Sequence, residues 1–186
     1  MKTILVDIDD TLIPTVTHYA NKCLSQEEHY KIGTLARLKS IFTSEGWREF
    51  ANIYDDIRNE LLDRKDVQEW IKFLLKESYD RLDSDDARIF IRSNLPPSKE
   101  TFDRIVSTLR SFAELLSIPI QEISFLESMD FNVFGRCNTG LVVDDSPARL
   151  MEAYEFENWS VLKITRPWNV CVKIDYLEFP FHIRQT

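Results

Sequence analysis

Three short runs of apolar residues end in polar residues, and this pattern restricts the fold more than any other feature of the chain. The runs cover residues 3–6, 89–91 and 141–143. Each is too short for a helix and does not alternate with polar residues, which predicts fully buried strands of a parallel sheet. Ligands of open α/β sheets bind outside the carboxyl ends of the strands. The sequence therefore predicts an α/β protein with a site assembled from distant segments.

The intervening segments indicate helices. Residues 14–87 are rich in charge, contain few turn residues and repeat apolar residues every three to four positions, as amphipathic helices do. A helix over about residues 98–116 begins after Pro97, and Ser146 and Pro147 open another of about ten residues. Further strands are predicted over residues 123–125 and 161–164. The long helical segment thus separates the first predicted strand from the second.

The composition excludes several classes of protein. The net charge is −8, so a surface for long nucleic acids is not expected. The 4 glycines are too scattered for a dinucleotide-binding or Walker-type phosphate loop. No apolar stretch approaches the length of a membrane span, and the 3 cysteines form no CxxC pair, so neither a membrane segment nor a zinc site is predicted. We expect a soluble, cytoplasmic protein without a membrane partner.

Carboxylates follow the first and the third predicted strands. Asp7 and Asp9 follow the first, and Asp144 and Asp145 follow the third. Buried carboxylates are costly unless a cation accompanies them, and an all-oxygen group suits Mg²⁺ bridging to a substrate phosphate. A carboxylate can also act as a covalent nucleophile. The role of Asp145 stays open at this point, because it is equally placed to cap the helix after Ser146.

These residues resemble the motifs of the haloacid dehalogenase superfamily of phosphatases. The first motif of that family, DxDx(T/V) after a buried strand, is matched by residues 7–11, and the second, a Ser or Thr at a strand end, is matched by Ser93. The acidic fourth motif is matched by Asp144 and Asp145. The resemblance implies a Rossmann-like parallel α/β core over residues 1–13 and 88–186. It also implies a helical cap inserted over residues 14–87.

The same resemblance implies a reaction and a set of site residues. Asp7 would attack phosphorus to give an aspartyl phosphate, and Asp9 would protonate the leaving oxygen and later activate water. The activity would be Mg²⁺-dependent hydrolysis of a phosphomonoester. The implied metal ligands are Asp7, Asp9, Asp144 and Asp145. The implied phosphate-binding residues are Thr11, Ser93, Asn94 and Arg136.

One cation that the resemblance implies is missing. The third motif of the superfamily is a Lys that neutralises the phosphoryl oxygens, but no Lys occurs between Lys99 and Lys163. Arg136, eight residues before Asp144, is the best-placed replacement by spacing, and Lys99 is the other candidate. Arg supplies charge and bidentate contacts but is not equivalent to Lys. Reduced activity is therefore one of the expected outcomes.

Within the superfamily, the chain is most similar to the 5′(3′)-deoxyribonucleotidase-like branch. This similarity rests on residues 144–147 and 161–169. It implies a small phosphorylated substrate, such as a nucleoside monophosphate. Five aromatic residues of the helical segment are candidates to stack on a base, namely Trp47, Phe50, Tyr54, Trp70 and Tyr79. The alternatives are a phosphatase of phosphoproteins or nucleic-acid ends, or a binding protein that has lost turnover; the sequence does not define the oligomeric state.

Overall fold

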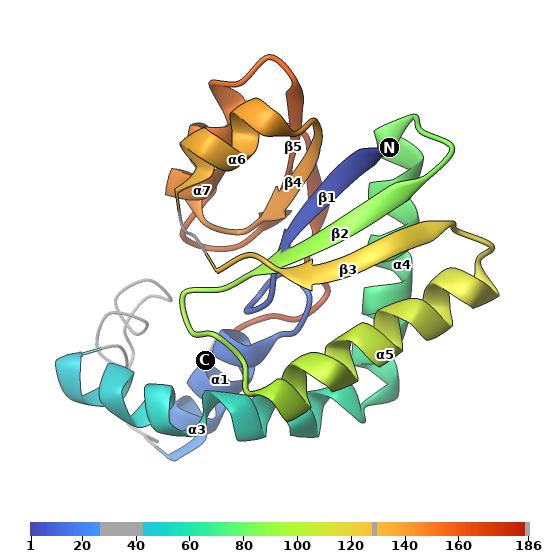
Figure 1. Ribbon diagram of the computed structural model, residues 1–186. Coiled ribbons are helices and arrows are strands. Elements are labelled where there is room, and N and C mark those ends of the chain that lie inside the picture. Colours follow the sequence, from blue (N-terminus) through green and yellow to red (C-terminus); the bar gives the residue numbers. More distant parts are fainter. Residues whose placement is uncertain (27–42, 128–129, 185–186) are drawn as a thin grey trace.

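A sheet of six parallel strands forms the centre of the protein. The computed structural model describes residues 1–26, 43–127 and 130–184. Its strands are β1 (Lys2–Asp7), β2 (Ala87–Arg92), β3 (Ile120–Phe125), β4 (Gly140–Asp144), β5 (Trp159–Thr165) and β6 (Tyr176–Glu178). They lie in the order β3-β2-β1-β4-β5-β6, and Figure 1 shows this order from β3 to β5. The chain therefore builds first to one side of β1 and afterwards to the other, and the strand order reverses between β1 and β4.

Helices cover both faces of this sheet. In the described part of the chain they are α1 (Thr15–Gln26), α3 (Ser44–Leu62), α4 (Lys65–Leu82), α5 (Lys99–Leu115), α6 (Phe131–Cys137) and α7 (Pro147–Tyr154). Figure 1 shows α4 and α5 on one face and α6 and α7 on the other. The predicted α/β class is confirmed. None of the described helices combines the length and the apolar character that crossing a membrane requires.

Alternate side chains of the central strands fill the two layers between sheet and helices. Ile4 and Val6 of β1 belong to the larger hydrophobic cluster, which includes residues of α3, α4 and α5. Leu5 belongs to the smaller cluster, which includes residues of α6 and α7. All three side chains are buried. A strand covered on both faces has no solvent-facing position, which explains why β1 is a continuous apolar run.

The predicted strands and two of the predicted helix starts are confirmed. Each of the five predicted runs lies within one of the strands β1 to β5. Ser98 caps α5, because its Oγ accepts a hydrogen bond from the Thr101 N–H at 3.2 Å. α7 begins at Pro147 as expected and has 8 residues rather than about ten. The short strand β6 was not predicted.

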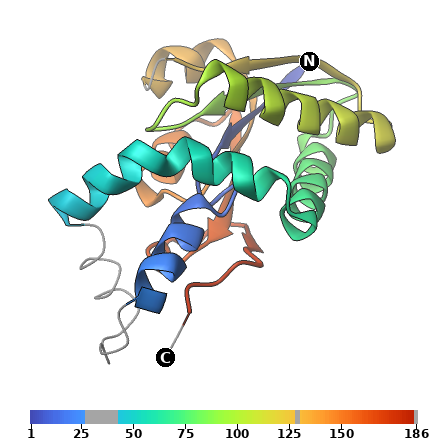
Figure 2. The same ribbon diagram turned by 90° about the horizontal axis from the view of Figure 1, so that it is seen from below.

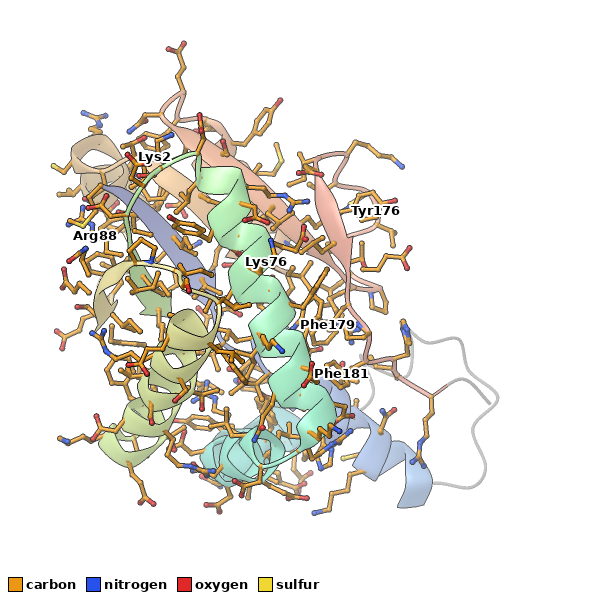
Figure 3. The ribbon with its side chains drawn as sticks, turned by 90° about the vertical axis from the view of Figure 1, so that its right-hand side faces the viewer. Lys2, Lys76, Arg88, Tyr176, Phe179 and Phe181 are labelled. Atoms are coloured by element: carbon orange, nitrogen blue, oxygen red, sulfur yellow. The ribbon has the colours of Figure 1, made fainter. Side chains whose placement is uncertain are left out.

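Part of the segment over residues 14–87, which was expected to form the cap, packs directly against the sheet. α4 packs against β1 and β4, and Figure 3 shows it across the sheet with Phe179 and Phe181 beside it. The rings of Trp70 on α4 and Phe179 have centroids 5.4 Å apart. α1 and α3 lie in front of the sheet in Figure 2, and α3 contacts α1, α4 and α5. The division into a core and a cap stays a prediction.

Candidate functional site

Three buried aspartates meet at the carboxyl edge of the sheet, where the strand order reverses. Asp7 is the last residue of β1, Asp144 is the last of β4, and Asp145 follows directly. One carboxylate oxygen of each residue lies within 4.8 Å of the other two. The two strand ends meet because β1 and β4 are adjacent and parallel. The sequence separates these residues widely, and the sheet brings them into one cluster.

The cluster is electrostatically unfavourable in the absence of a cation. Burial raises the pKa of the Asp7 carboxyl well above its usual range, and the charge of Asp144 raises it further, against the opposing effect of Arg149 and Arg92. Burial also raises the pKa of the Asp145 carboxyl, and the charges of Asp7 and Asp144 raise it further. A divalent cation would offset this cost. An all-oxygen donor set fits a hard dication such as Mg²⁺, Ca²⁺ or Mn²⁺, and these residues do not select one of the three.

Two buried arginines contact the same carboxylates. Arg149 on α7 donates from Nη1 to Asp7 Oδ1 at 2.7 Å, and this nitrogen lies 3.5 Å from Asp144 Oδ2. Its Nη2 donates to the Asn94 side-chain oxygen. Arg92, the last residue of β2, donates from Nη2 to Asp144 Oδ2 at 3.3 Å. The aspartate cluster is therefore partly neutralised by the protein itself.

Asp9 lies beside this cluster but faces a different cation. Its Oδ1 accepts from Arg58 Nε at 2.9 Å, and its Oδ2 accepts from Arg58 Nη2 at 2.5 Å. Arg58 on α3 is fully buried. The structure thus groups Asp7, Asp144 and Asp145, and directs both oxygens of Asp9, the fourth expected metal ligand, towards α3.

Three of the expected phosphate ligands, Ser93, Asn94 and Thr11, each contact a different charged residue of the site or its surroundings. The Ser93 hydroxyl donates to Asp9 Oδ2 at 3.3 Å and accepts from Arg58 Nη2 at 3.0 Å. Asn94 is exposed and contacts Arg149. Thr11 is completely buried and its hydroxyl lies 3.4 Å from Asp145 Oδ1, so it contacts a carboxylate of the cluster.

Neither predicted replacement for the missing Lys reaches the cluster. Arg136 lies in the last turn of α6 and is exposed. The preceding Gly135 carbonyl accepts from the indole N–H of Trp159, the first residue of β5, at 2.9 Å, so this end of α6 lies at the amino edge of the sheet. Lys99 is exposed and forms an ion pair with Asp103 at 2.6 Å. The prediction that Arg136 or Lys99 takes the place of the missing Lys is therefore not supported by their positions. Spacing along the chain does not reveal which edge of the sheet a helix end reaches.

The role of Asp145 becomes clearer from its partners. The N–H of Ser146 donates to Asp144 Oδ1 at 2.9 Å, so Asp144 rather than Asp145 supports the start of α7. Asp145 Oδ2 accepts from the indole N–H of Trp168 at 2.7 Å, and its carbonyl accepts from Asn169 Nδ2 at 2.8 Å. The segment after β5 therefore fixes Asp145 in the cluster.

The clustered aspartates and several of their partners border one cavity of about 200 Å³. Its polar lining residues are Asp7, Asp9, Ser93, Asn94, Asp144, Asp145, Ser146 and Arg149, and its apolar ones are Val16, Trp47, Phe50, Leu95, Pro147 and Trp168. Two of the five aromatic residues considered for base stacking, Trp47 and Phe50, thus reach it. Trp70 belongs to the hydrophobic core, where its indole N–H donates to the Thr11 carbonyl at 2.8 Å.

A larger and more open hollow of about 720 Å³ lies along the C-terminal segment. Glu178 is the acidic residue among the described residues that border it, and basic residues there include Arg166 and Arg184. It does not contain the aspartate cluster. We therefore assign the candidate site to the smaller cavity, where buried carboxylates, a hydroxyl and a guanidinium converge.

The sequence did not identify Arg58, Arg149 or the indole of Trp168 as partners of the aspartates. Arg149 lies four residues after Asp145, one turn into the helix whose start points at the cluster, and this spacing is a detectable indication. Arg58 directly follows Ile57 of the apolar stripe on α3, and nothing in this pattern indicates that Arg58 is itself buried. Trp168 was noted in the segment over residues 161–169 without a partner.

Comparison with models of known protein families, with curated proteins and with solved structures finds no match to this chain.

Proposed function

We propose that this chain is a metal-dependent phosphomonoesterase of the haloacid dehalogenase type with a Rossmann-like core. One observation carries the proposal: Asp7, Asp9, Ser93 and the pair Asp144 and Asp145 come from three separate strand ends and border one cavity. The reversal of strand order between β1 and β4 supports it, because ligands of open parallel sheets bind at such a point. In this proposal, α1 and α3 belong to the cap.

The proposed reaction has two steps. An oxygen of Asp7 attacks phosphorus, the bond from phosphorus to the leaving oxygen breaks, and Asp9 gives its proton to that oxygen. The alcohol leaves, and the phosphoryl group stays on Asp7 as an aspartyl phosphate. Asp9 then accepts a proton from water while the water oxygen attacks phosphorus and the bond to Asp7 breaks. Inorganic phosphate leaves, and both aspartates return to their starting forms.

Asp7, Asp144 and Asp145 would hold the metal ion. When bound, a dication such as Mg²⁺ lowers the repulsion between a carboxylate and an anionic phosphate. The protein orients two of these ligands through hydrogen bonds: Trp168 donates to Asp145 at 2.7 Å, and the Ser146 N–H donates to Asp144 at 2.9 Å. Such supporting contacts are typical of groups that bind metals.

The cavity favours a small substrate. Its volume of about 200 Å³ lies below the roughly 300–1,000 Å³ of sites for larger ligands. A phosphoryl group and a few further atoms fit inside, and a larger leaving group would extend along Trp47, which is 44% exposed. A base could stack on this indole, so nucleoside monophosphates are the first substrates to compare. A cavity of this size does not favour a phosphoprotein or a nucleic-acid end.

Hydrolysis assays test the proposal directly. We expect the protein to hydrolyse p-nitrophenyl phosphate with Mg²⁺ and to lose this activity in EDTA. Asp7→Asn should abolish hydrolysis, whereas Asp56→Asn, at an exposed position of α3, should leave it unchanged. Activity that survives Asp7→Asn, or that needs no metal, contradicts the mechanism. A panel of nucleoside monophosphates and sugar phosphates ranked by kcat/KM then tests the substrate class, and a clear preference for sugar phosphates removes the nucleotide assignment.

One observation favours a second function, phosphate binding without turnover. Both oxygens of Asp9 accept hydrogen bonds from Arg58, which is the arrangement of an ionised carboxylate rather than of a proton donor. The first step of the proposed reaction needs a neutral Asp9, and a neutral carboxyl loses the charge-assisted part of these two bonds. Calorimetric binding of inorganic phosphate, without hydrolysis of any monophosphate in the panel, would support this second function.

A further inference from the structure

The proposed reaction brings an anionic phosphate to a wall of aspartates, and a cation must offset the repulsion. Within the described part of the chain, Arg149 is the one Lys or Arg that lines the cavity. Arg92 and Arg58 lie behind the wall with 1% and 0% exposure, and their guanidinium groups face Asp144 and Asp9. Arg149 therefore borders the cavity, whereas Arg92 and Arg58 do not.

The guanidinium of Arg149 spans the cavity wall. Its Nη1 donates to Asp7 Oδ1, the oxygen of the proposed nucleophile, at 2.7 Å. Its Nη2 donates to the side-chain oxygen of Asn94. Asn94 follows Ser93 directly, and both residues line the same cavity. One nitrogen of Arg149 therefore holds the proposed nucleophile, and the other contacts the residue next to Ser93, the proposed phosphate ligand.

The contact with Asn94 is the one that a substrate can replace. A phosphate oxygen is a stronger acceptor for this guanidinium than a neutral amide oxygen, because it carries negative charge and phosphate can accept two parallel N–H bonds from arginine. Asn94 is exposed, so its side chain can turn to solvent. By contrast, Asp7 is buried and its contact with Arg149 is charge-assisted at both ends.

We infer that Arg149 binds the phosphoryl group and orients Asp7 for attack, while Asn94 occupies the place of a phosphoryl oxygen in the substrate-free protein. This inference rests on the proposed function. It places the cation on α7, after the acidic pair, whereas spacing along the sequence placed it before the pair, at Arg136.

Substitutions of Arg149 test the inference. Arg149→Met removes the charge at similar length, and Arg136→Met is the matched control. We expect kcat/KM for p-nitrophenyl phosphate to fall by about 10²–10³-fold in Arg149→Met, to recover in part in Arg149→Lys and to stay unchanged in Arg136→Met. Guanidinium added to Arg149→Ala should restore activity, and it should not activate the wild type. A purely structural role does not predict this rescue.

Binding of inorganic phosphate gives a readout that does not need turnover. In the presence of Mg²⁺, phosphate should raise the Tm of the wild type and of Arg136→Met but not that of Arg149→Met. Equal phosphate binding in Arg149→Met, or a kcat/KM within about threefold of the wild type, overturns the inference and leaves the proposed function intact. If the wild type hydrolyses no monophosphate, the proposed function fails, and phosphate binding alone decides the role of Arg149.

A second variant covers the case in which Arg149→Met does not fold. Asn94→Asp places a carboxylate against Arg149 Nη2, where it competes with phosphate for the guanidinium. We expect KM to rise by about tenfold or more in Asn94→Asp, whereas Asn52→Asp, the same change at an exposed position of α3 outside the cavity, should leave KM unchanged. An unchanged KM in Asn94→Asp contradicts the proposed contact between phosphate and Nη2.

Discussion

Arg58 carries a full charge in the interior of the protein. Its guanidinium donates to both oxygens of Asp9, to Asp55 Oδ1 at 3.2 Å, to the Ser93 hydroxyl and to the Leu95 carbonyl at 2.8 Å. These bonds join α3 to the segments that follow β1 and β2. Because the interior tolerates a charge only when its partners satisfy it, removing Arg58 also leaves Asp9 uncompensated.

We therefore expect Arg58→Met to destabilise the protein by about 3–5 kcal/mol. Urea denaturation measures this free energy of unfolding. Arg64→Met is the matched control, since the exposed pair between Arg64 and Asp66 should contribute less than about 1 kcal/mol. The double variant Arg58→Met with Asp9→Asn should recover part of the loss. Equal losses in the Arg58 and Arg64 variants would show that the buried pair contributes nothing specific.

At the scale of single residues, the sequence predicted the carboxylates of the site but not the cations. Asp7 and Asp144 were found because each ends an apolar run, so their position at a strand end follows from the pattern. Arg58 and Arg149 lie on helices, and the direction of a helical side chain depends on how the helix is rotated against its neighbours. Tertiary packing determines that rotation, and a single sequence carries only a weak indication of it.

At the scale of elements, β4 approaches β1 closely at Gly140. A Cβ atom at this position would lie 1.8 Å from the Thr3 carbonyl oxygen and 2.7 Å from its carbon. Gly140 is the register partner of Thr3 at the start of the pairing between β1 and β4. The absence of a side chain therefore allows the two central strands to lie side by side.

Gly140→Ala should accordingly force the strands apart and destabilise the protein by about 3 kcal/mol. Ser160→Ala, at an exposed position of the neighbouring β5, should change the free energy of unfolding by no more than about 0.5 kcal/mol. Thermal and urea unfolding of both variants measure the difference. A Gly140→Ala protein as stable as the wild type would contradict the close approach of β1 and β4.

The strands that could be predicted are those covered on both faces. β1, β2 and β4 appear in the sequence as apolar runs because helices cover both faces of the sheet. β6 could not be predicted, since its residues Tyr176–Glu178 include an exposed tyrosine and an exposed glutamate at the sheet edge. Its pairing with β5 depends on contacts that form only in the folded protein.

At the scale of the whole molecule, strand order was the main feature that the sequence left open. The apolar runs indicate which segments form buried strands. The order of these strands along the chain does not determine which of them become neighbours in the sheet. The adjacency of β1 to both β2 and β4 places all the site residues at one edge. The site prediction depended on that adjacency, which the structure supplies.

The aspartate cluster gives the metal-free protein a characteristic pH dependence. The pKa values of Asp7 and Asp145 are raised by burial, so between their ordinary and their raised values the folded state binds more protons than the unfolded state. The cluster's contribution to the free energy of unfolding therefore falls as pH rises through this range, and a metal ion that replaces the protons restores it. Mg²⁺ at about 100 times its Kd should raise the Tm at pH 8 by about 5–10 °C, and by less at pH 5.

Comparing the Tm with and without Mg²⁺ at each pH cancels the contributions of other titrating groups to stability. Burial lowers the pKa of His18, which makes the folded protein more stable as pH rises and so acts in the opposite direction. This effect is the same with and without metal. Asp145→Asn should stabilise the metal-free protein at pH 8 and reduce its response to Mg²⁺. A response that is equal at both pH values, or unchanged in Asp145→Asn, would place the metal elsewhere.

The central position of β1 has a consequence for the order of folding during synthesis. Thr3 pairs with Arg88 on one side and with Gly140 on the other. At about 5–20 residues per second, the ribosome releases β1 several seconds before β4 exists. Until then one edge of β1 is unpaired and open to association with other chains. The repulsion between Asp7 and Asp144 also arises only when β4 docks, so the aspartate cluster can form only after β4 has been synthesised and has paired with β1.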